Sequence, residues 1–213
     1  MKKLWLLFGL VFIISFAILG WVGTEIFRQA PPIPASVVAS DGRVVLGEGD
    51  IDRGQNVWQA MGGMQVGSIW GHGSYVAPDW TADYLHRESL FILNGLAQKE
   101  YGKSYEQINV EQQAGLQKRL QAIVRTNTYN AATNSITIDP LRAQAFEENL
   151  KLYSNIFTNG NSDYAIQKNA QSDPEKLRQM TGFFFWTAWA SAANRPNDTI
   201  SYTSNFPSEP LVG

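Results

Sequence analysis

The chain has 213 residues with 17 Lys and Arg against 19 Asp and Glu, a formal net charge of -2 that leaves no basic surface for nucleic acid. It contains no Cys, which excludes disulfide bonds, thiolate metal sites and a catalytic thiol. Its length suits one folded domain plus a membrane anchor, and an aromatic content of 12% with 7 Trp indicates extensive ring burial or closeness to a membrane interface.

An uncharged stretch runs from Leu4 to Thr24, directly after two lysines. About 20 apolar residues are enough for a helix to cross the hydrocarbon core. The lysines favour a cytoplasmic N-terminus, with the rest of the chain on the extracytoplasmic side. The alternative is a cleaved signal peptide, for which Ser15-Phe16-Ala17 loosely fits the cleavage site. We favour the anchor, because cleavage there would leave the apolar residues 18–22 exposed at the new terminus.

A proline-rich spacer at residues 31–34 follows and is expected to be stiff and extended. Beyond it, two short apolar runs, Val37-Val38 and Val44-Val45-Leu46, flank Asp41-Gly42. Asp-Gly between apolar runs is the strongest short-range signal for a hairpin. The sequence therefore predicts a small β-hairpin.

Residues 52–81 hold the highest density of Gly and Trp in the chain: Gly54, Gly62, Gly63, Gly67, Gly71 and Gly73, with Trp58, Trp70 and Trp80. Glycines allow positive φ and close backbone approach, whereas tryptophans supply large buried area at fixed points. A helix from Gly54 to Met61 is expected to lead into an irregular loop shaped to wrap an object. Thr81 is expected to cap the next helix, with Asp83 in its first turn.

Most of the remaining chain is predicted to be helical, because capping residues precede apolar positions at helical spacing. The helix after Thr81 is expected to end near Tyr101-Gly102. Further helices are expected to start at Asn109, at Asp139-Pro140 (running to about Phe157) and at Asp173-Pro174. Between them, Tyr129 to Ile138 is typical of a short extended pair that turns at Asn134-Ser135.

The helix after Asp173 becomes apolar on every face from Met180 to Ala193. This run is too short to cross a membrane and must be buried. It is either the central core helix of the domain or a contact with neighbouring membrane helices, for which Phe185, Trp186 and Trp189 are the candidates. After it, prolines are expected to keep residues 196–213 extended and out of regular structure.

A resemblance becomes specific at the glycine-rich loop. Gly54, Val57 and Trp58, the loop itself and the following residues 73–79 (GSYVAPD) resemble the start of a cytochrome c domain, in particular the cytochrome subunit of bacterial nitric oxide reductases. In that pattern a C-x-x-C-H motif in the loop attaches haem covalently. Aligned on the Gly-Ser-Tyr end, the two cysteine positions fall on Gly63 and Val66, and the axial histidine position falls on Gly67.

This loss resembles the single-chain, quinol-dependent nitric oxide reductases, whose N-terminal region keeps the cytochrome c shape without haem. Matching signatures are residues 70–88 and the tail segments 184–189, 195–196, 201–203 and 209–213. The resemblance implies a mainly α fold: one N-terminal transmembrane helix, then a cytochrome c-like helical domain with a small β-hairpin and no C-x-x-C-H haem site. The implied divisions are an anchor (1–30), a linker with the hairpin (31–50), the extracytoplasmic domain (51–195) and an extended exit toward a second membrane helix (196–213).

By the same resemblance, the parent enzyme is an oxidoreductase of the haem-copper oxidase superfamily in the bacterial inner membrane. It reduces nitric oxide to N2O and water with electrons from quinol, in denitrification or nitric oxide detoxification. Its haem b, high-spin haem b and non-haem iron are held by histidines of a later multi-span region, so this segment is expected to carry no catalytic residue, cofactor or metal. Expected partners are that catalytic region and the lipid bilayer, with a homodimer as an open option.

Within this segment, Trp58, Trp70 and Trp80 are the candidates for filling the volume that a haem would occupy. His72 is expected to cap or orient the loop, and His86 to lie on an exposed or interfacial helix face. His86-Arg87-Glu88 with Asp83 suggests a charged surface cluster. Two alternatives stay open: a free-standing, membrane-anchored binding or scaffold module, and an electron carrier whose non-covalent haem uses one histidine and a Met.

Overall fold

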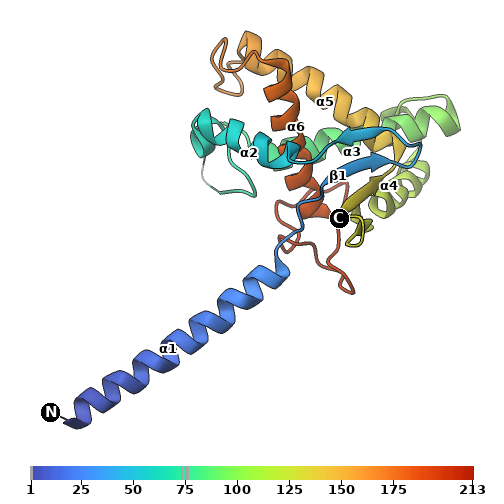
Figure 1. Ribbon diagram of the computed structural model, residues 1–213. Helices are drawn as coiled ribbons and strands as arrows, with labels where there is room; N and C mark the ends of the chain where they lie inside the picture. The colour runs from blue at the N-terminus through green and yellow to red at the C-terminus, as the bar shows by residue number, and fades with distance from the viewer. Residues whose placement is uncertain (1, 73, 75–76) are drawn as a thin grey trace. The chain divides into compact units, whose positions relative to one another are not determined.

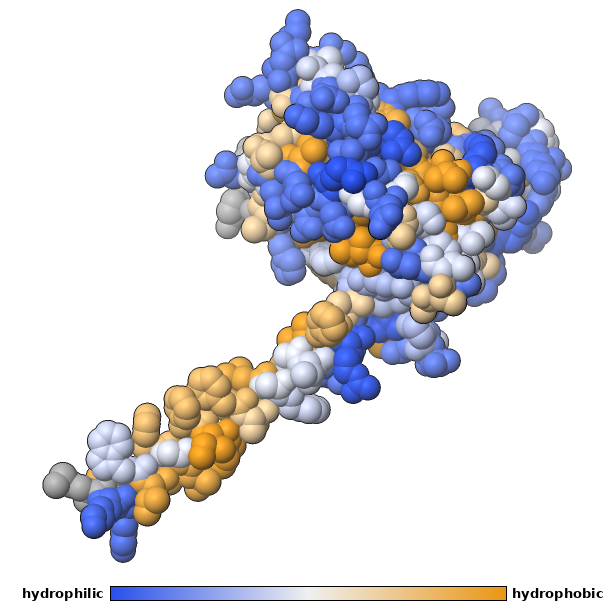
Figure 2. Space-filling model, viewed as in Figure 1, coloured by the Kyte–Doolittle hydropathy of each residue, from blue (hydrophilic) through white to orange (hydrophobic). Residues whose placement is uncertain are grey.

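The computed structural model describes residues 2–72, 74 and 77–213. The chain forms two compact units, Met1–Pro32 and Ile33–Gly213. The first unit is one helix, α1 (Lys2–Gln29), whose 28 residues are long and apolar enough to cross a membrane. Figure 2 shows apolar residues along almost all of α1, with hydrophilic ones only near its ends.

The second unit contains a small four-stranded sheet in the order β2-β1-β4-β3. Strands β1 (Ser36–Ala39) and β2 (Val44–Leu46) form the predicted antiparallel hairpin. The second predicted pair is β3 (Tyr129–Asn130) with β4 (Ser135–Ile138), and Ser135 begins β4 rather than completing the turn. The sheet is completed by parallel pairing of β1 with β4, which no local signal in the sequence indicates.

Five α-helices make up most of the described part of this unit, and Figure 1 shows α6 running through its middle. They are α2 (Asp50–Ala60), α3 (Trp80–Tyr101), α4 (Val110–Arg125), α5 (Pro140–Asn159) and α6 (Pro174–Ala192). Two 3-10 turns, η1 (Gly63–Val66) and η2 (Tyr105–Gln107), lie in the connections. The fold class is therefore mainly α with a small sheet, as predicted.

Helix starts follow the predicted caps with one exception. Asp139 and Asp173 each accept a hydrogen bond from the first turn of the helix that follows, as expected. The predicted cap Thr81 is wrong: Asp79 caps α3, its carboxylate accepting from Ala82 N at 2.9 Å. Helix α2 also begins at Asp50, four residues before the predicted Gly54, since 50 to 54 is four positions.

Helix α6 is the core helix of the domain and packs against α2, α3 and α5. The predicted apolar run is buried from Met180 through Ala193. Its closest helix contact is with α2, where a Cβ on Gly54 would lie 2.0 Å from the carbonyl oxygen of Gln179. Only glycine allows the two backbones to approach this closely.

The predicted surface cluster around Glu88 is wrong in one member. Glu88 is fully buried, and its carboxylate accepts two hydrogen bonds from Arg142, at 2.8 and 3.2 Å, with Arg142 itself 2% exposed. Arg142 lies on α5, so the ion pair joins α3 to α5 inside the core. Residues 196–213, all of which the structure describes, contain no helix or strand and fold back through turns instead of running extended.

Candidate functional site: the glycine-rich loop and the aromatic hollow

The glycine-rich loop between α2 and α3 is tied to the start of α3 by Asp79. One carboxylate oxygen of Asp79 caps the helix, and the other accepts hydrogen bonds from the Ser68 hydroxyl at 2.9 Å and from Gly71 N. A parallel bridge between Ser68 and Asp79 closes the same part of the loop. One acidic side chain thus serves both helix and loop, which explains why it precedes Trp80.

Two tryptophans hold the loop from the inside. The indole N–H of Trp80 donates to the carbonyl oxygen of Val66 at 2.9 Å, and that of Trp58 donates to the carbonyl oxygen of Gly67 at 3.3 Å. Gly63 lies over Trp58, since a Cβ there would be 3.9 Å from its ring. All three positions that the cytochrome resemblance assigns to haem attachment therefore lie against Trp58 or Trp80.

Trp80 fills the space beneath the loop. It is fully buried, its ring stacks on Phe184 with centroids 5.1 Å apart, and it lies parallel to Tyr164 at 5.7 Å. Tyr153 and Phe157 complete the cluster with centroid distances of 5.6 and 5.2 Å. Such stacked and edge-to-face pairs add stability beyond the area that they bury.

The residues present do not fit a haem of the c type. The chain has no thiol, and the axial position Gly67 has φ +130°, where a Cβ would lie 2.0 Å from the Trp80 Nε1 atom. No side chain can enter at that point unless the buried indole moves. The volume next to the loop is occupied by protein aromatic rings rather than available to a macrocycle.

Trp70 lies at the edge of this cluster rather than inside it. It has φ 53°, and its indole N–H donates to the carbonyl oxygen of Thr187 at 3.0 Å. Its backbone N–H donates to the hydroxyl of Thr81 at 3.2 Å, and that hydroxyl pairs with the Thr187 hydroxyl at 3.1 Å. Thr81, which does not cap α3, thus joins the loop to α6.

Between loop, α2 and α6 lies an apolar depression of about 420 Å³, here called the aromatic hollow. Four aromatic rings line it, together with five other residues, none of them acidic or basic apart from His72: Trp58, Trp70, Phe183 and Trp186, then Gln55, Met64, Ile69, His72 and Thr187. Trp70 and Trp186 lie 5.7 Å apart, and so do Trp58 and Phe183. The sequence pointed to the three tryptophans and His72 but not to Phe183 and Ile69, because no local pattern shows which residues of a fully apolar helix face the loop.

The remaining predicted aromatics, Phe185 and Trp189, are fully buried inside the domain. Phe185 packs edge-on against Tyr84 and Phe146, and Trp189 lies 5.5 Å from Tyr202. Their side chains therefore contact the domain's own core. Of the predicted interface residues on α6, Trp186 is the one that reaches a depression on the surface.

The two histidines lie in different parts of the domain. His72 is exposed at the aromatic hollow, whereas His86, on α3, places Nδ1 3.1 Å from a carboxylate oxygen of Glu209. Among the described residues, no group of three or more His, Cys, Asp and Glu gathers as metal ligands would.

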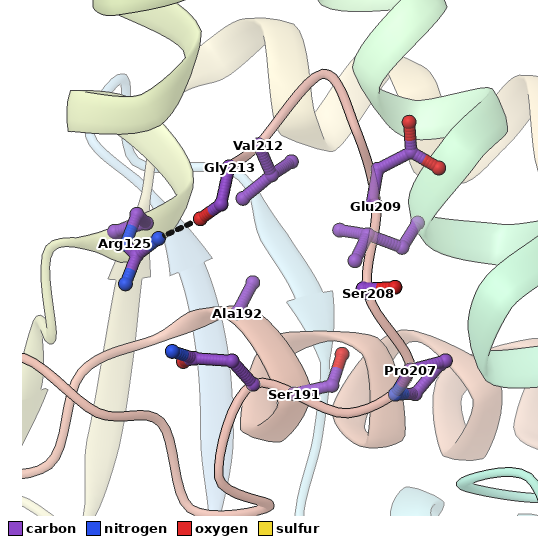
Figure 3. Close-up of a pocket in the computed structure, with 10 residues that line it drawn as sticks. Arg125, Ser191, Ala192, Pro207, Ser208, Glu209, Val212 and Gly213 are labelled. Atoms are coloured by element: carbon purple, nitrogen blue, oxygen red, sulfur yellow. Dashed lines mark hydrogen bonds between the residues drawn. The ribbon is translucent and has the colours of Figure 1, made fainter.

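Glu209 belongs to the C-terminal segment, which borders a second, smaller pocket of about 90 Å³ (Figure 3). The Arg125 guanidinium, on α4, donates to the carbonyl oxygens of Gly213 and, at 3.0 Å, Thr199. Val212 is buried beside it. The segment is therefore fixed to α3 and α4 by named polar contacts at both His86 and Arg125.

A polar cluster on the other side of Trp80 orders the loop before α6. The Asp83 carboxylate accepts from Arg87 at 2.9 Å, from the Tyr153 hydroxyl at 2.9 Å and from the Tyr164 hydroxyl at 2.7 Å. Burial, then the Asp83 charge, raises the pKa of Tyr153 well above its ordinary value, so Tyr153 stays a protonated donor. The cluster positions Tyr164 on Trp80 and has a structural role.

The model of the NorB cytochrome c-like domain family, a domain of nitric oxide reductase, matches residues 34–208, most of the second unit. No curated protein matches the chain. The match agrees with the mainly helical fold, and the loop geometry shows a cytochrome c-like domain in which aromatic side chains occupy the haem-attachment region. The chain belongs to the family of NorB cytochrome c-like domains of nitric oxide reductases.

Proposed function

We propose that this chain is the N-terminal portion of a membrane-bound, quinol-dependent nitric oxide reductase. The reaction combines two molecules of NO with one quinol to give N2O, water and quinone, so the two electrons and two protons of the quinol are consumed. In this proposal α1 is the membrane anchor with a cytoplasmic N-terminus. The second unit is an extracytoplasmic structural domain over the catalytic membrane part, and it carries no active site.

The filled haem-attachment region supports this proposal most directly. A cytochrome domain relays electrons from an external donor through its haem, but here Trp80 occupies the space beside Gly67. Electrons would then have to reach the membrane part without passing through this domain. A quinol dissolved in the bilayer is a donor that can do so.

The proposed divisions of the chain follow from the same reasoning. Residues 1–30 form the anchor, 31–50 the linker and hairpin, 51–195 the cytochrome c-like domain and 196–213 the exit toward a following membrane region. The haem b, high-spin haem b and non-haem iron of the proposed enzyme would be bound by histidines outside this chain. His72 and His86 are not among those ligands in this proposal, because they lie on separate elements with separate surroundings.

A second candidate is a membrane-anchored, haem-free scaffold module, and the aromatic hollow favours it because a concave apolar surface suits a protein partner. The third, an electron carrier with non-covalent haem, is the least supported. It would need space for the macrocycle beside His72 or His86, whereas the region under the loop is filled by Trp80 and Phe184.

Purification from native membranes with an antibody against the second unit tests the proposal. We expect the chain in material far larger than its own 23.7 kDa, containing haem b and reducing NO to N2O. Recovery at 23.7 kDa without haem protein would contradict the reductase assignment and favour the scaffold module.

A further inference from the structure

We propose that the aromatic hollow is the docking site for an uncharged, apolar loop of the reductase's own membrane part. This inference rests on the proposed function and adds the surface through which the domain is held. The family match supports the choice of partner, because residues 34–208 correspond to one domain of a larger protein. The rest of that protein is a partner present at equal concentration.

The chemistry of the hollow fits an apolar protein side chain. The indole N–H groups of Trp58 and Trp70 already donate to Gly67 and Thr187, so these rings offer the hollow their carbon surfaces rather than hydrogen bonds. A ligand that depends on polar contacts would obtain few from them. Aromatic residues and Met are enriched in the centres of protein interfaces, where they form pockets for apolar anchors.

The charge pattern also points to an uncharged occupant. Among the residues that the structure describes, the hollow is lined without Asp, Glu, Lys or Arg, although a cation held between aromatic rings is normally accompanied by a carboxylate. Its polar members, Gln55, His72 and Thr187, come from three different segments. An apolar centre with uncharged polar groups around it is the usual anatomy of a protein interface.

Exposed apolar side chains continue the surface beyond the hollow itself. Met64 is 52% exposed at its edge. Phe206, from the C-terminal segment, is 51% exposed and lies against Gly71, where a Cβ would be 2.1 Å from its ring. The apolar surface therefore extends across the loop to the tail, which is wider than a small ligand needs.

Photo-cross-linking in native membranes tests the proposal in the full chain. A benzophenone amino acid replaces Met64 in one strain and Val110, which is 79% exposed at the start of α4, in a control strain. We expect cross-links from position 64 to peptides of the reductase's membrane part, and none to that part from position 110. In parallel, Met64→Glu should lower co-purification of the membrane part about tenfold or more, with Val110→Glu unchanged.

The outcomes separate this proposal from the proposed function. If the reductase is recovered intact and active but position 64 cross-links only to lipid, to a second copy of the chain or no more than position 110 does, the docking proposal is wrong and the proposed function stands. If the chain is recovered alone and without haem protein, both are wrong.

Discussion

The contact between Gly67 and Trp80 gives the sharpest test of the filled haem-attachment region. Gly67→Ala introduces two costs: a side chain at φ +130° and a Cβ 2.0 Å from the Trp80 indole nitrogen. Backbone strain at such a position costs about 1–3 kcal/mol, and overpacking a filled core costs about 1–3 kcal/mol. The free energy of unfolding should therefore fall by about 2–6 kcal/mol.

Gly42→Ala is the matched control, because Gly42 has φ +91° but nothing within 4 Å of an added Cβ. It should lose only the strain contribution, about 1–3 kcal/mol. Urea unfolding of the full chain in detergent, followed by far-ultraviolet circular dichroism, measures both variants without relying on tryptophan emission.

A double-mutant cycle with Trp80→Phe isolates the contact itself. Removing the five-membered ring takes away the atoms that meet the new Cβ, so Gly67→Ala should cost about 1–3 kcal/mol less in that background. If Gly67→Ala costs no more than Gly42→Ala, or costs the same with Phe at position 80, the indole does not close the space beside the loop.

Three further changes test separate parts of the domain. Arg142→Ala leaves the Glu88 carboxylate buried and unpaired, so the free energy of unfolding should fall by about 3–5 kcal/mol by urea titration. Asp50 is buried, which opposes ionisation, but hydrogen bonds from Gly47 N, Arg53 and Arg178 outweigh burial and hold its pKa below the ordinary value. Its stabilisation is therefore present above about pH 4 and lost as pH falls through the depressed pKa, so Asp50→Asn should lower stability at pH 7 by about 1–3 kcal/mol and flatten the acid-side decline. Trp70→Ala, at the rim, should destabilise the domain by less than the roughly 3–5 kcal/mol expected for truncating a fully buried Trp.

Each of these changes has its own control and contradicting result. Lys151→Ala breaks an exposed pair with Glu148 and should leave the unfolding midpoint unchanged, whereas equal losses for Lys151 and Arg142 would contradict the buried-pair argument. Asp163→Asn removes an exposed carboxylate and should not alter the acid-side slope. A Trp70→Ala loss as large as that of Trp80→Ala would place Trp70 in the core rather than at the hollow.

Local signals in the sequence predicted the elements well. The Asp-Gly turn indicated the hairpin, and the Asp-Pro pairs indicated the starts of α5 and α6, because capping and turn chemistry act within a few residues. The apolar run of α6 could not decide alone between a core helix and a membrane contact. Burial of Met180 to Ala193 inside the domain settles that its main contacts are internal.

What the sequence could not predict depends on partners far away in the chain. The parallel pairing of β1 with β4 joins segments about a hundred residues apart, and Glu88 is buried because Arg142 meets it inside the core. The cap at Asp79 was missed because Thr81 is an equally good local candidate until Thr187 draws it toward α6. The aromatic hollow draws on three segments, and only their packing brings Phe183 and Ile69 to the tryptophans.

The identity of the electron donor tests the central claim most directly. Material purified through the second unit is supplied with NO and either a short-chain quinol or reduced cytochrome c, and NO consumption is followed with an electrode. The account predicts that quinol sustains NO reduction and that reduced cytochrome c does not. Turnover driven by cytochrome c but not by quinol would contradict it.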